Sequence, residues 1–379
     1  MHLFISDLFI SIDTLAPVID ILKEKNKKVK ILNINPVENF SKDKLYAYLK
    51  KRGVLFEKFL PVNLYEKIFL IVINFLKILP SSIIKKIDFF WRYIYKFSKF
   101  SSSKQIKEFL LKNKISSITY EETAEPRRLK LIFKTAKELH IPIIQFPAGV
   151  HTLKVHQLGE NELKYCDYYI APNKIRKFNK KYKNKILTYG SPRYSEKWIS
   201  KLNKIYSPVK KKNKISIYLI KRTKFTELNL INELENKLKE NKNYHVISNN
   251  KPRDYLPTKC TGFYENYKTT QLINWCDFIV SSRSSSVLLE GIKKDKKILL
   301  LKYLYPKISK SLLIGSNKNI FLIKDFKKMI WVLSKKENSK ISKIEKNGTL
   351  KKFLVNYGKK NFKASILKIY QRTENYAIK

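Results

Sequence analysis

The sequence predicts an α/β protein with two doubly wound parallel sheets, and three observations support this fold class. Short apolar runs alternate with amphipathic stretches of helical length along most of the chain, a pattern typical of parallel strands joined by helices. The chain has 379 residues, enough for two domains with full hydrophobic cores. A lysine-rich segment at 207–214 separates two series of such elements. We therefore expect one sheet on each side of that segment.

The first predicted domain spans residues 1–206. Apolar runs bounded by polar turns favour strands, which are expected at 3–6, 29–34, 54–59, 115–120, 141–145, 168–171 and 186–189. Helical spacing of apolar residues predicts helices at 14–25, 42–51 and 128–139. An aromatic-rich insert at about 64–111 is also expected to be helical.

The second predicted domain spans residues 207–349. Its strands are expected at 215–220, 244–248, 278–280 and 298–301, and its helices at 225–240, at 269–275 and from about 287. The remaining segment, 350–379, is expected to carry a helix over 350–370 and to pack back on the first domain. We expect two Rossmann-like sheets facing a cleft, with ligands at the carboxyl ends of the strands.

Two short segments of the chain are similar to each other. Residues 165–170 have the sequence YCDYYI, and residues 275–280 have the sequence WCDFIV. Each spans the end of a helix or turn and the start of a predicted strand. We expect the two junctions to lie at equivalent points of two similar sheets.

The formal net charge of +48 has three interpretations. The abundance of lysine, asparagine, isoleucine and tyrosine favours compositional drift from AT-rich coding. Attraction to an anionic membrane surface or an anionic substrate is the second interpretation, and nucleic-acid binding is the third. The lysines are spread along the whole chain, and no familiar nucleic-acid-binding module is present. We therefore expect no specific nucleic-acid partner.

The three cysteines indicate buried thiols in a reducing compartment. Cys166, Cys260 and Cys276 form no C-x-x-C pair, and two of them lie in apolar runs. This usage favours neither a zinc site nor a disulfide framework. The first fifteen residues contain Asp7 and Asp13 and lack a positively charged leader, so we expect no signal peptide.

The insert carries the longest apolar run of the chain, at 68–76, which Lys77, Ile78 and Leu79 follow. It is shorter than the roughly 20 apolar residues that a membrane-spanning helix needs. Lysines flank it, and a cluster of aromatic residues follows at 89–95. This combination suits a helix lying in a membrane interface. Two helices packed on the core are the alternative interpretation.

A serine-rich turn follows the predicted strand at 278–280. It spans 281–286, has the sequence SSRSSS and precedes a predicted helix. Hydroxyls and unpaired backbone N–H groups at the start of a helix suit a phosphate or a sugar phosphate. Serines also cap helices well, so capping alone is the alternative interpretation.

Polar residues also follow several other predicted strands. His151 is the best general-base candidate because its ordinary pKa lies near neutrality, and a structural histidine is the alternative. Glu121 and Glu122 are candidates to deprotonate or hold an acceptor hydroxyl, but neighbouring residues of a strand point to opposite faces. The cations Arg193, Lys221, Arg222 and Arg283 suit a diphosphate. Solvated positions are the alternative interpretation for all of these charged residues.

Three segments resemble the GT-B-type glycosyltransferases of bacterial surface-polysaccharide synthesis. They are also similar to the related glycerophosphate polymerases and sugar-nucleotide 2-epimerases. The segments are WCDFIVSSRSSSVLLEGIKKDKKILLL at 275–301, IPIIQFPAGVH at 141–151 and ILTYGSPRYSEKW at 186–198. The resemblance covers residues 115–302 in order. The usual histidine–glycine pair is replaced by GVH at 149–151, and glycine is rare throughout.

The resemblance implies a two-domain, GT-B-like enzyme that binds a nucleotide-sugar in its C-terminal domain and an acceptor in its N-terminal domain. Its catalytic residues are expected to be His151, Glu121 and Glu122. Its donor-binding residues are expected to be Gly190, Ser191, Arg193, Lys221, Arg222, Ser282, Arg283, Ser284, Ser285, Ser286 and Glu290, the last of which would bind the ribose. No carboxylate cluster has metal-ligand spacing, which fits chemistry without a metal.

We therefore expect a metal-independent glycosyltransferase with no cofactor beyond its nucleotide-sugar substrate. Its acceptor is expected to be a cell-envelope glycan or a lipid-linked molecule. The expected location is the cytoplasm, peripheral to the inner face of the plasma membrane. The alternatives are a glycerophosphate or polyol-phosphate transferase and a non-catalytic basic scaffold that binds RNA or membranes.

Overall fold

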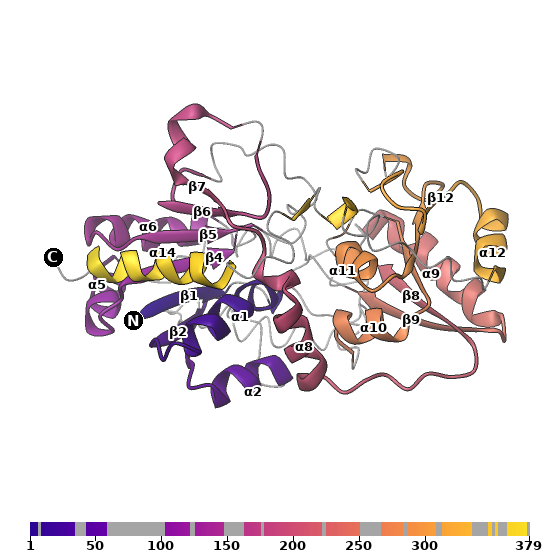
Figure 1. Ribbon diagram of the computed structural model, residues 1–379, viewed down its shortest axis with the longest axis horizontal. Helices are drawn as coiled ribbons and strands as arrows, with labels where there is room; N and C mark the ends of the chain where they lie inside the picture. Colours follow the sequence, from indigo (N-terminus) through magenta and orange to yellow (C-terminus); the bar gives the residue numbers. More distant parts are fainter. Residues whose placement is uncertain are drawn as a thin grey trace. The chain divides into compact units, whose positions relative to one another are not determined.

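The computed structural model divides into two compact units (Figure 1). Unit 1 comprises Met1–Trp198 and Leu354–Lys379, and unit 2 comprises Ile199–Phe353. The structure describes residues 1–6, 9–34, 43–58, 103–121, 126–147, 163–175, 178–221, 225–250, 267–282, 285, 287–307, 313–335, 348–350, 353–354 and 362–376. Residues 59–102 lie outside this description, and they include most of the predicted insert at 64–111 with its apolar run and aromatic cluster.

Unit 1 is built on one parallel sheet of seven strands. The strands are β1 (His2–Ser6), β2 (Val29–Asn33), β3 (Leu55–Lys58), β4 (Ser117–Glu121), β5 (Ile143–Phe146), β6 (Tyr168–Ala171) and β7 (Ile186–Thr188). Their order is β3-β2-β1-β4-β5-β6-β7, and neighbouring strands run parallel. The chain fills the sheet from β1 outward to one edge and then from β4 to the other, so the order reverses between β1 and β4.

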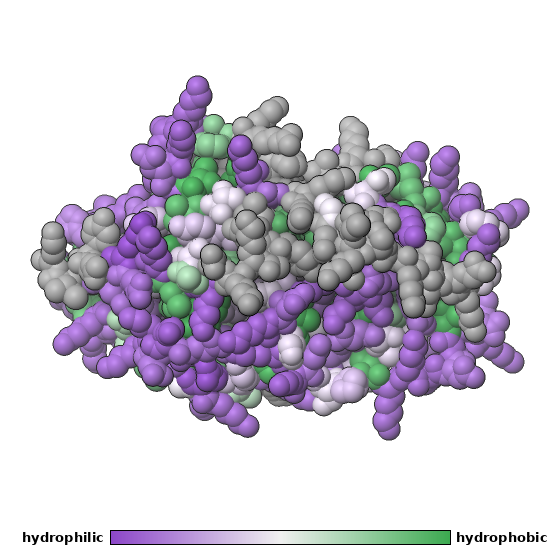
Figure 2. Space-filling view, viewed as in Figure 1, coloured by the Kyte–Doolittle hydropathy of each residue, from purple (hydrophilic) through white to green (hydrophobic). Residues whose placement is uncertain are grey.

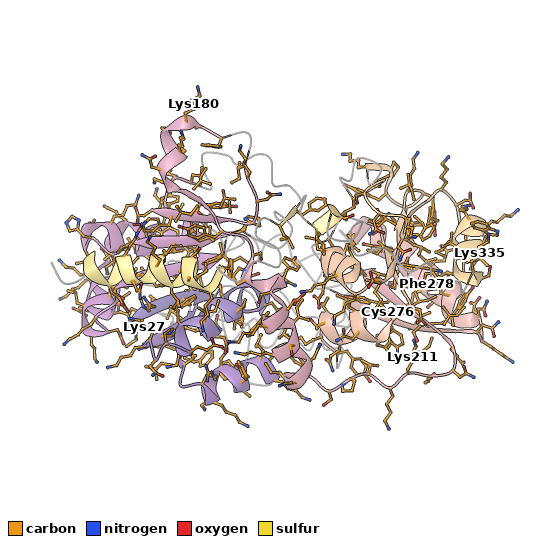
Figure 3. The ribbon with its side chains drawn as sticks, viewed as in Figure 1. Lys27, Lys180, Lys211, Cys276, Phe278 and Lys335 are labelled. Atoms are coloured by element: carbon orange, nitrogen blue, oxygen red, sulfur yellow. The ribbon has the colours of Figure 1, made fainter. Side chains whose placement is uncertain are left out.

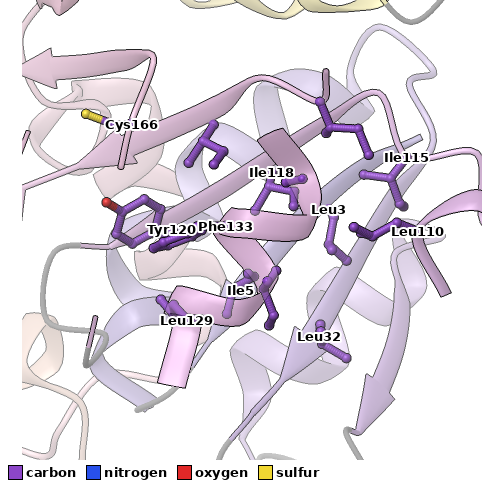
Figure 4. Close-up of a cluster of buried hydrophobic side chains, with 14 of the residues drawn as sticks. Leu3, Ile5, Leu32, Leu110, Ile115, Ile118, Tyr120, Leu129, Phe133 and Cys166 are labelled. Atoms are coloured by element: carbon purple, nitrogen blue, oxygen red, sulfur yellow. The ribbon is translucent and has the colours of Figure 1, made fainter. Parts of the chain in front are cut away.

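Helices cover both faces of the unit 1 sheet. Helices α5 (Ser103–Lys112) and α6 (Pro126–Glu138) place their apolar side chains in the core on one face (Figure 4). There Leu3 and Ile118 of the sheet meet Leu110 and Phe133 of the helices. Helices α1 (Phe9–Lys23) and α14 (Phe362–Tyr376) pack on the other face. Further helices are α2 (Lys44–Lys51) and α8 (Glu196–Ile205), which lies at the junction of the two units.

The C-terminal helix α14 returns to the start of unit 1 (Figure 1). Tyr370 is buried, its hydroxyl lies 2.8 Å from Thr119 Oγ1, and its ring stacks on Phe4 at 6.1 Å. The helix begins at Phe362. The prediction of one long helix over 350–370 is therefore wrong in its bounds.

Unit 2 is built on one parallel sheet of five strands. The strands are β8 (Ile215–Lys221), β9 (Tyr244–Asn250), β10 (Phe278–Ser281), β11 (Lys297–Leu301) and β12 (Ile320–Ile323). Their order is β12-β11-β10-β8-β9, and neighbouring strands run parallel. The order reverses between β8 and β10.

Helices also cover both faces of the unit 2 sheet. Helices α9 (Phe225–Glu240) and α12 (Phe326–Ser334) share a core with alternate residues of the strands, among them Val280 and Leu299. The intervening residues Ile279 and Ile298 point to the opposite face, where α11 (Val287–Lys293) packs closely through Gly291. Helix α10 (Thr269–Trp275) packs beside α11. Strand β12 and helices α8 and α12 are absent from the predicted elements.

The two similar segments form the same local structure. In unit 1, Asp167 Oδ2 accepts the backbone N–H of Ile143 at 2.8 Å, and Lys185 Nζ donates to the Cys166 carbonyl at 2.7 Å. In unit 2, Asp277 Oδ2 accepts the N–H of Ser216 at 2.9 Å. Lys296, just before β11, corresponds to Lys185, because its Nζ donates to the Cys276 carbonyl at 2.7 Å.

These junctions do not lie at equivalent points of the sheets, so that prediction is wrong. Strand β6 is next to the edge strand β7, whereas β10 lies where the order of unit 2 reverses. The likeness is therefore local to the junction. Cys166 and Cys276 are both buried free thiols (Cys276 is labelled in Figure 3), which confirms the prediction for these two. Burial raises the pKa of each thiol to about 12, so neither is reactive near neutral pH.

Candidate functional site

The reversals of strand order indicate where each unit would bind a ligand. In open parallel sheets, ligands bind outside the carboxyl ends of the strands at the point where the order reverses. In unit 2 this point lies between the ends of β8 and β10, at Lys221 and Ser281. In unit 1 it lies between the ends of β1 and β4, at Ser6 and Glu121. Three of these four strand-end residues are wholly or almost wholly buried: Ser6, Glu121 and Ser281.

The serine turn begins at the reversal point of unit 2. Ser281 ends β10, and Ser282 follows it with only 2% of its surface exposed. The Ser282 hydroxyl is buried and has no hydrogen-bond partner among the described residues. Buried polar atoms in proteins are almost always hydrogen-bonded, so an exception at a sheet edge of this kind suits a bound ligand or water. Arg283, Ser284 and Ser286 lie outside the described residues.

Ser285 contributes to the start of α11. Its Oγ accepts the backbone N–H of Val287 at 3.4 Å, and its carbonyl accepts the N–H of Leu288 at 3.0 Å. The capping interpretation therefore holds for Ser285, whatever else its hydroxyl does. Glu290 lies in the first turn of the helix and is 5% exposed. The solvated interpretation of Glu290 is thus wrong, because the helix buries this carboxyl group instead.

Lys221 lies beside the serine turn through strand pairing. It is the last residue of β8, and Ile220, just before it, is paired in register with Ser281 of β10. The backbone therefore places the predicted cation and the serine turn at the same edge. Arg222 lies outside the described residues.

Glu121 is held inside unit 1 at the reversal point. It is the last residue of β4 and is fully buried, so the predicted strand end at residue 120 is one residue short and the solvated-loop interpretation is wrong. Thr119 and Glu121 share one face of the sheet, the face that α1 and α14 cover. Thr14 of α1 donates its hydroxyl hydrogen to Glu121 Oε1 at 2.7 Å.

Thr14 is not among the site residues that the sequence predicts. Thr14 and Glu121 are 107 positions apart in the chain. No local pattern connects them, and only the packing of α1 against β4 brings them together. Glu122 and His151 lie outside the described residues.

The GSPR segment forms a tight turn after β7. Gly190 has φ of 91°, a left-handed conformation that favours glycine. Its N–H donates to the Ala171 carbonyl at 3.1 Å, which ties the turn to β6. Ser191 precedes a short 3₁₀ turn at Pro192–Tyr194 that packs on α1, and the Arg193 guanidinium lies 6.0 Å from the ring of Tyr194. Gly190, Ser191 and Arg193 therefore belong to unit 1, whereas the other donor-binding candidates belong to unit 2.

Solved structures share this fold over nearly the whole chain. UGT89C1 of Arabidopsis thaliana, in complex with UDP, aligns with a TM-score of 0.54 and 12% identity over 98% of this chain and 99% of its own. MurG of Acinetobacter baumannii aligns with a TM-score of 0.50 and 9% identity over 98% of this chain and 99% of its own. Both are GT-B glycosyltransferases, so the predicted GT-B-like fold is confirmed. No protein-family model matches the sequence, and no curated protein matches it closely enough to count as a relative.

Two further findings bear on the predicted anionic and membrane partners. Hydrophilic side chains cover much of the surface in view (Figure 2), as the net charge of +48 leads one to expect. Within the part of the chain that the structure describes, no helix is long and apolar enough to cross a membrane.

Proposed function

We propose that the protein is a glycosyltransferase that binds a nucleotide-sugar in unit 2 and an acceptor in unit 1. One observation carries this proposal. The Ser282 hydroxyl is buried at the reversal point of the unit 2 sheet and has no hydrogen-bond partner in the described part of the chain. A diphosphate oxygen there would accept the hydrogen bond that the Ser282 hydroxyl lacks. The GT-B fold supports the proposal, and UGT89C1, which shares it, has UDP bound in its solved structure.

The proposed reaction exchanges one glycosidic bond for another. The bond between the sugar C1 and the diphosphate oxygen breaks, and a bond forms between C1 and the acceptor hydroxyl oxygen. The acceptor proton passes to a base, for which we propose His151, and the nucleoside diphosphate leaves with the electron pair of the broken bond. We propose that Glu121, oriented by Thr14, holds the acceptor hydroxyl, and that Glu122 stands beside it.

Cations and backbone groups are proposed to stabilise the leaving diphosphate without a metal. Candidate donor-binding groups are Lys221, Arg222 and Arg283 with the serines of the turn, Glu290 at the ribose, and Gly190, Ser191 and Arg193 from unit 1. We further propose an acceptor that is a cell-envelope glycan or a lipid-linked molecule. The resemblance to surface-polysaccharide enzymes and the net charge of +48 support work at the inner face of the plasma membrane.

Titration of a Ser282→Ala variant tests the donor site. Because the Ser282 hydroxyl has no hydrogen-bond partner among the residues that the structure describes, removing it should leave the melting temperature unchanged or raise it slightly. Loss of a hydrogen bond to a charged phosphate should weaken nucleotide binding about tenfold to a hundredfold. The measurement is calorimetric titration with nucleoside diphosphates and their sugar and polyol conjugates, together with thermal unfolding.

Ser216→Ala is the matched control. The Ser216 hydroxyl is also buried and finds no hydrogen-bond partner among the described residues, but it lies near the amino end of β8, at the opposite edge of the sheet. This variant should show the same thermal behaviour with unchanged nucleotide affinity. Equal affinity in both variants and the wild type would remove the main support for the donor site. Binding of polyol conjugates in preference to sugar conjugates would favour the polyol-phosphate transferase.

A further inference from the structure

Helix α12 of unit 2 exposes a tryptophan between two lysines. Trp331 is 48% exposed. Lys328 Nζ lies 3.8 Å from the centroid of its ring, and Lys335 Nζ lies 4.0 Å from it. A single exposed apolar residue needs no explanation, but two ammonium groups against one exposed indole form a combined apolar and cationic surface.

The rest of the exposed face of α12 is also basic. Lys328, Trp331 and Lys335 follow one another at steps of about one helical turn, and Lys327 is exposed beside them. Lys324 is exposed just before the N-cap residue Asp325. Asp325 is the nearby carboxylate, and its Oδ1 caps the helix by accepting the backbone N–H of Lys328 at 2.7 Å. Among the residues that the structure describes, no carboxylate forms an ion pair with any of these four lysines.

The opposite side of α12 is fully engaged in the fold. Met329, Val332 and Leu333 are buried in the core that the helix shares with the sheet and α9. Replacing exposed residues of α12 therefore need not disturb the core. We call the exposed residues Lys324, Lys327, Lys328, Trp331 and Lys335 the α12 face (Lys335 is labelled in Figure 3).

We propose that the α12 face is a contact for an anionic membrane surface. Tryptophan favours the interface between water and lipid, because its ring is apolar and its N–H is polar. Lysines near an anionic leaflet gain electrostatic attraction, and their long side chains reach the headgroups while the helix lies along the surface. A surface for nucleic acid would use the same cations, but an RNA-binding face typically presents several aromatic rings for stacking, and the α12 face has one.

The test uses sedimentation with vesicles and needs neither donor nor acceptor, so it is independent of the proposed transfer reaction. One set of vesicles contains phosphatidylcholine alone, and the other contains phosphatidylcholine mixed with phosphatidylglycerol. Wild type should bind the anionic vesicles better, and less so at high salt. Lys328→Gln combined with Lys335→Gln should lower the partition coefficient at low salt about thirtyfold, since each lysine near the surface contributes about fivefold.

A second double variant controls for total charge. Lys237 and Lys239 lie on α9 of the same unit and pair with Glu233 and Glu235 at 2.7 and 2.6 Å. Replacing both with Gln removes the same charge from another helix and should leave the partition nearly unchanged. An equal loss in the two double variants would overturn the proposal in favour of non-specific attraction.

Trp331 itself reports on the contact. The difference in tryptophan fluorescence between wild type and Trp331→Phe gives the emission of Trp331 alone. This emission should shift to shorter wavelength when anionic vesicles are added, and brominated lipid should quench it. Unchanged Trp331 emission in protein that has sedimented with vesicles would overturn the proposal. A second result would also overturn the proposal. If the α12 double variant bound polyuridine less well than wild type but bound vesicles equally well, the α12 face would be a nucleic-acid surface.

Discussion

The buried polar residues at the two ends of the unit 1 sheet have different surroundings: those at the amino end bond to one another, and Glu121 at the carboxyl end lies at the predicted ligand position. At the amino end, His2 Nδ1 lies 2.9 Å from Ser117 Oγ, and His2 Nε2 lies 3.1 Å from Glu374 Oε1. Lys27 donates to the other oxygen of Glu374 at 2.6 Å. These side chains join the first strand to the last helix, so their role is structural. Glu121, at the carboxyl end, lies instead where the strand order reverses.

Acid should destabilise the protein through His2. Burial lowers the pKa of His2 from 6.5 to about 4, although the Glu374 carboxylate opposes this shift. Between these values the unfolded chain binds a proton that the folded chain does not. The stability that comes from neutral His2 is therefore complete above pH 6.5 and is lost as the pH falls toward 4. The loss should be roughly 3 kcal/mol.

Urea unfolding at a series of pH values measures this effect. His2→Asn has no titrating ring and should flatten the dependence of unfolding free energy on pH over this range. The control is His140→Asn, because His140 is exposed and its φ of 54° is one that asparagine tolerates. The assignment fails if His2→Asn and wild type lose stability in parallel.

At the scale of elements, the close packing of α11 on the sheet positions the serine turn. A Cβ at Gly291 would lie 2.5 Å from Ile279 Cδ1 and 3.5 Å from Ile298 Cδ1. The absence of a side chain at this position therefore allows α11 to approach β10 and β11. Because the turn connects β10 to α11, a displaced helix would also displace the backbone around Ser282.

Gly291→Ala should lower the unfolding free energy. The clashing atom is the terminal methyl of Ile279, which is fully buried and has little room to move away. Overpacking a buried site typically costs about 1–3 kcal/mol, and alanine in a helix gains about 1 kcal/mol over glycine, so the net loss should reach about 2 kcal/mol. Adding Ile279→Val removes the clashing methyl group and should restore much of the loss. Chemical denaturation of the single and double variants gives the comparison. Gly348→Ala is the control, since its Cβ would meet nothing within 4 Å, and a Gly291→Ala variant as stable as this control would refute the packing argument.

At the scale of the whole molecule, basic side chains are proposed to replace a metal ion. Lys and Arg total 79 against 31 Asp and Glu, so a diphosphate approaching the protein meets an excess of positive charge. One of those cations, Lys221, ends the strand β8 that borders the proposed donor site. The net charge would thus serve both the proposed binding of an anionic donor and the proposed contact with an anionic membrane.

Transfer should therefore continue in the presence of a chelator. The measurement is the release of nucleoside diphosphate from the donor identified by titration, with and without EDTA. Rates should agree within experimental error, because cations and backbone N–H groups stabilise the leaving group. A rate that falls with EDTA and recovers with magnesium or manganese would show that a divalent ion is needed.

Local sequence patterns predict most of the strands, several of the helices and the position of the serine turn. Helices α9 and α10 and strand β6 have the bounds that their apolar spacing predicts, because spacing along an element records which side faces the core. Strand β12 and helix α12 were missed, although Trp331 and its lysines carry the membrane proposal. Strand β12 is the unbroken apolar run IFLI, and α12 is apolar from Met329 to Leu333. A local signal for both elements was therefore present in the sequence, and the prediction overlooked it.

Only the tertiary structure decided which distant residues meet. The bond from Thr14 to Glu121, the contact of Tyr370 with Thr119 and the reversals of strand order depend on how strands and helices are arranged in each sheet. A sequence determines by itself that a strand is buried and a turn is polar, since those are properties of neighbouring residues. It does not state which strands become neighbours, because parallel pairing joins segments through crossovers that leave no local periodicity.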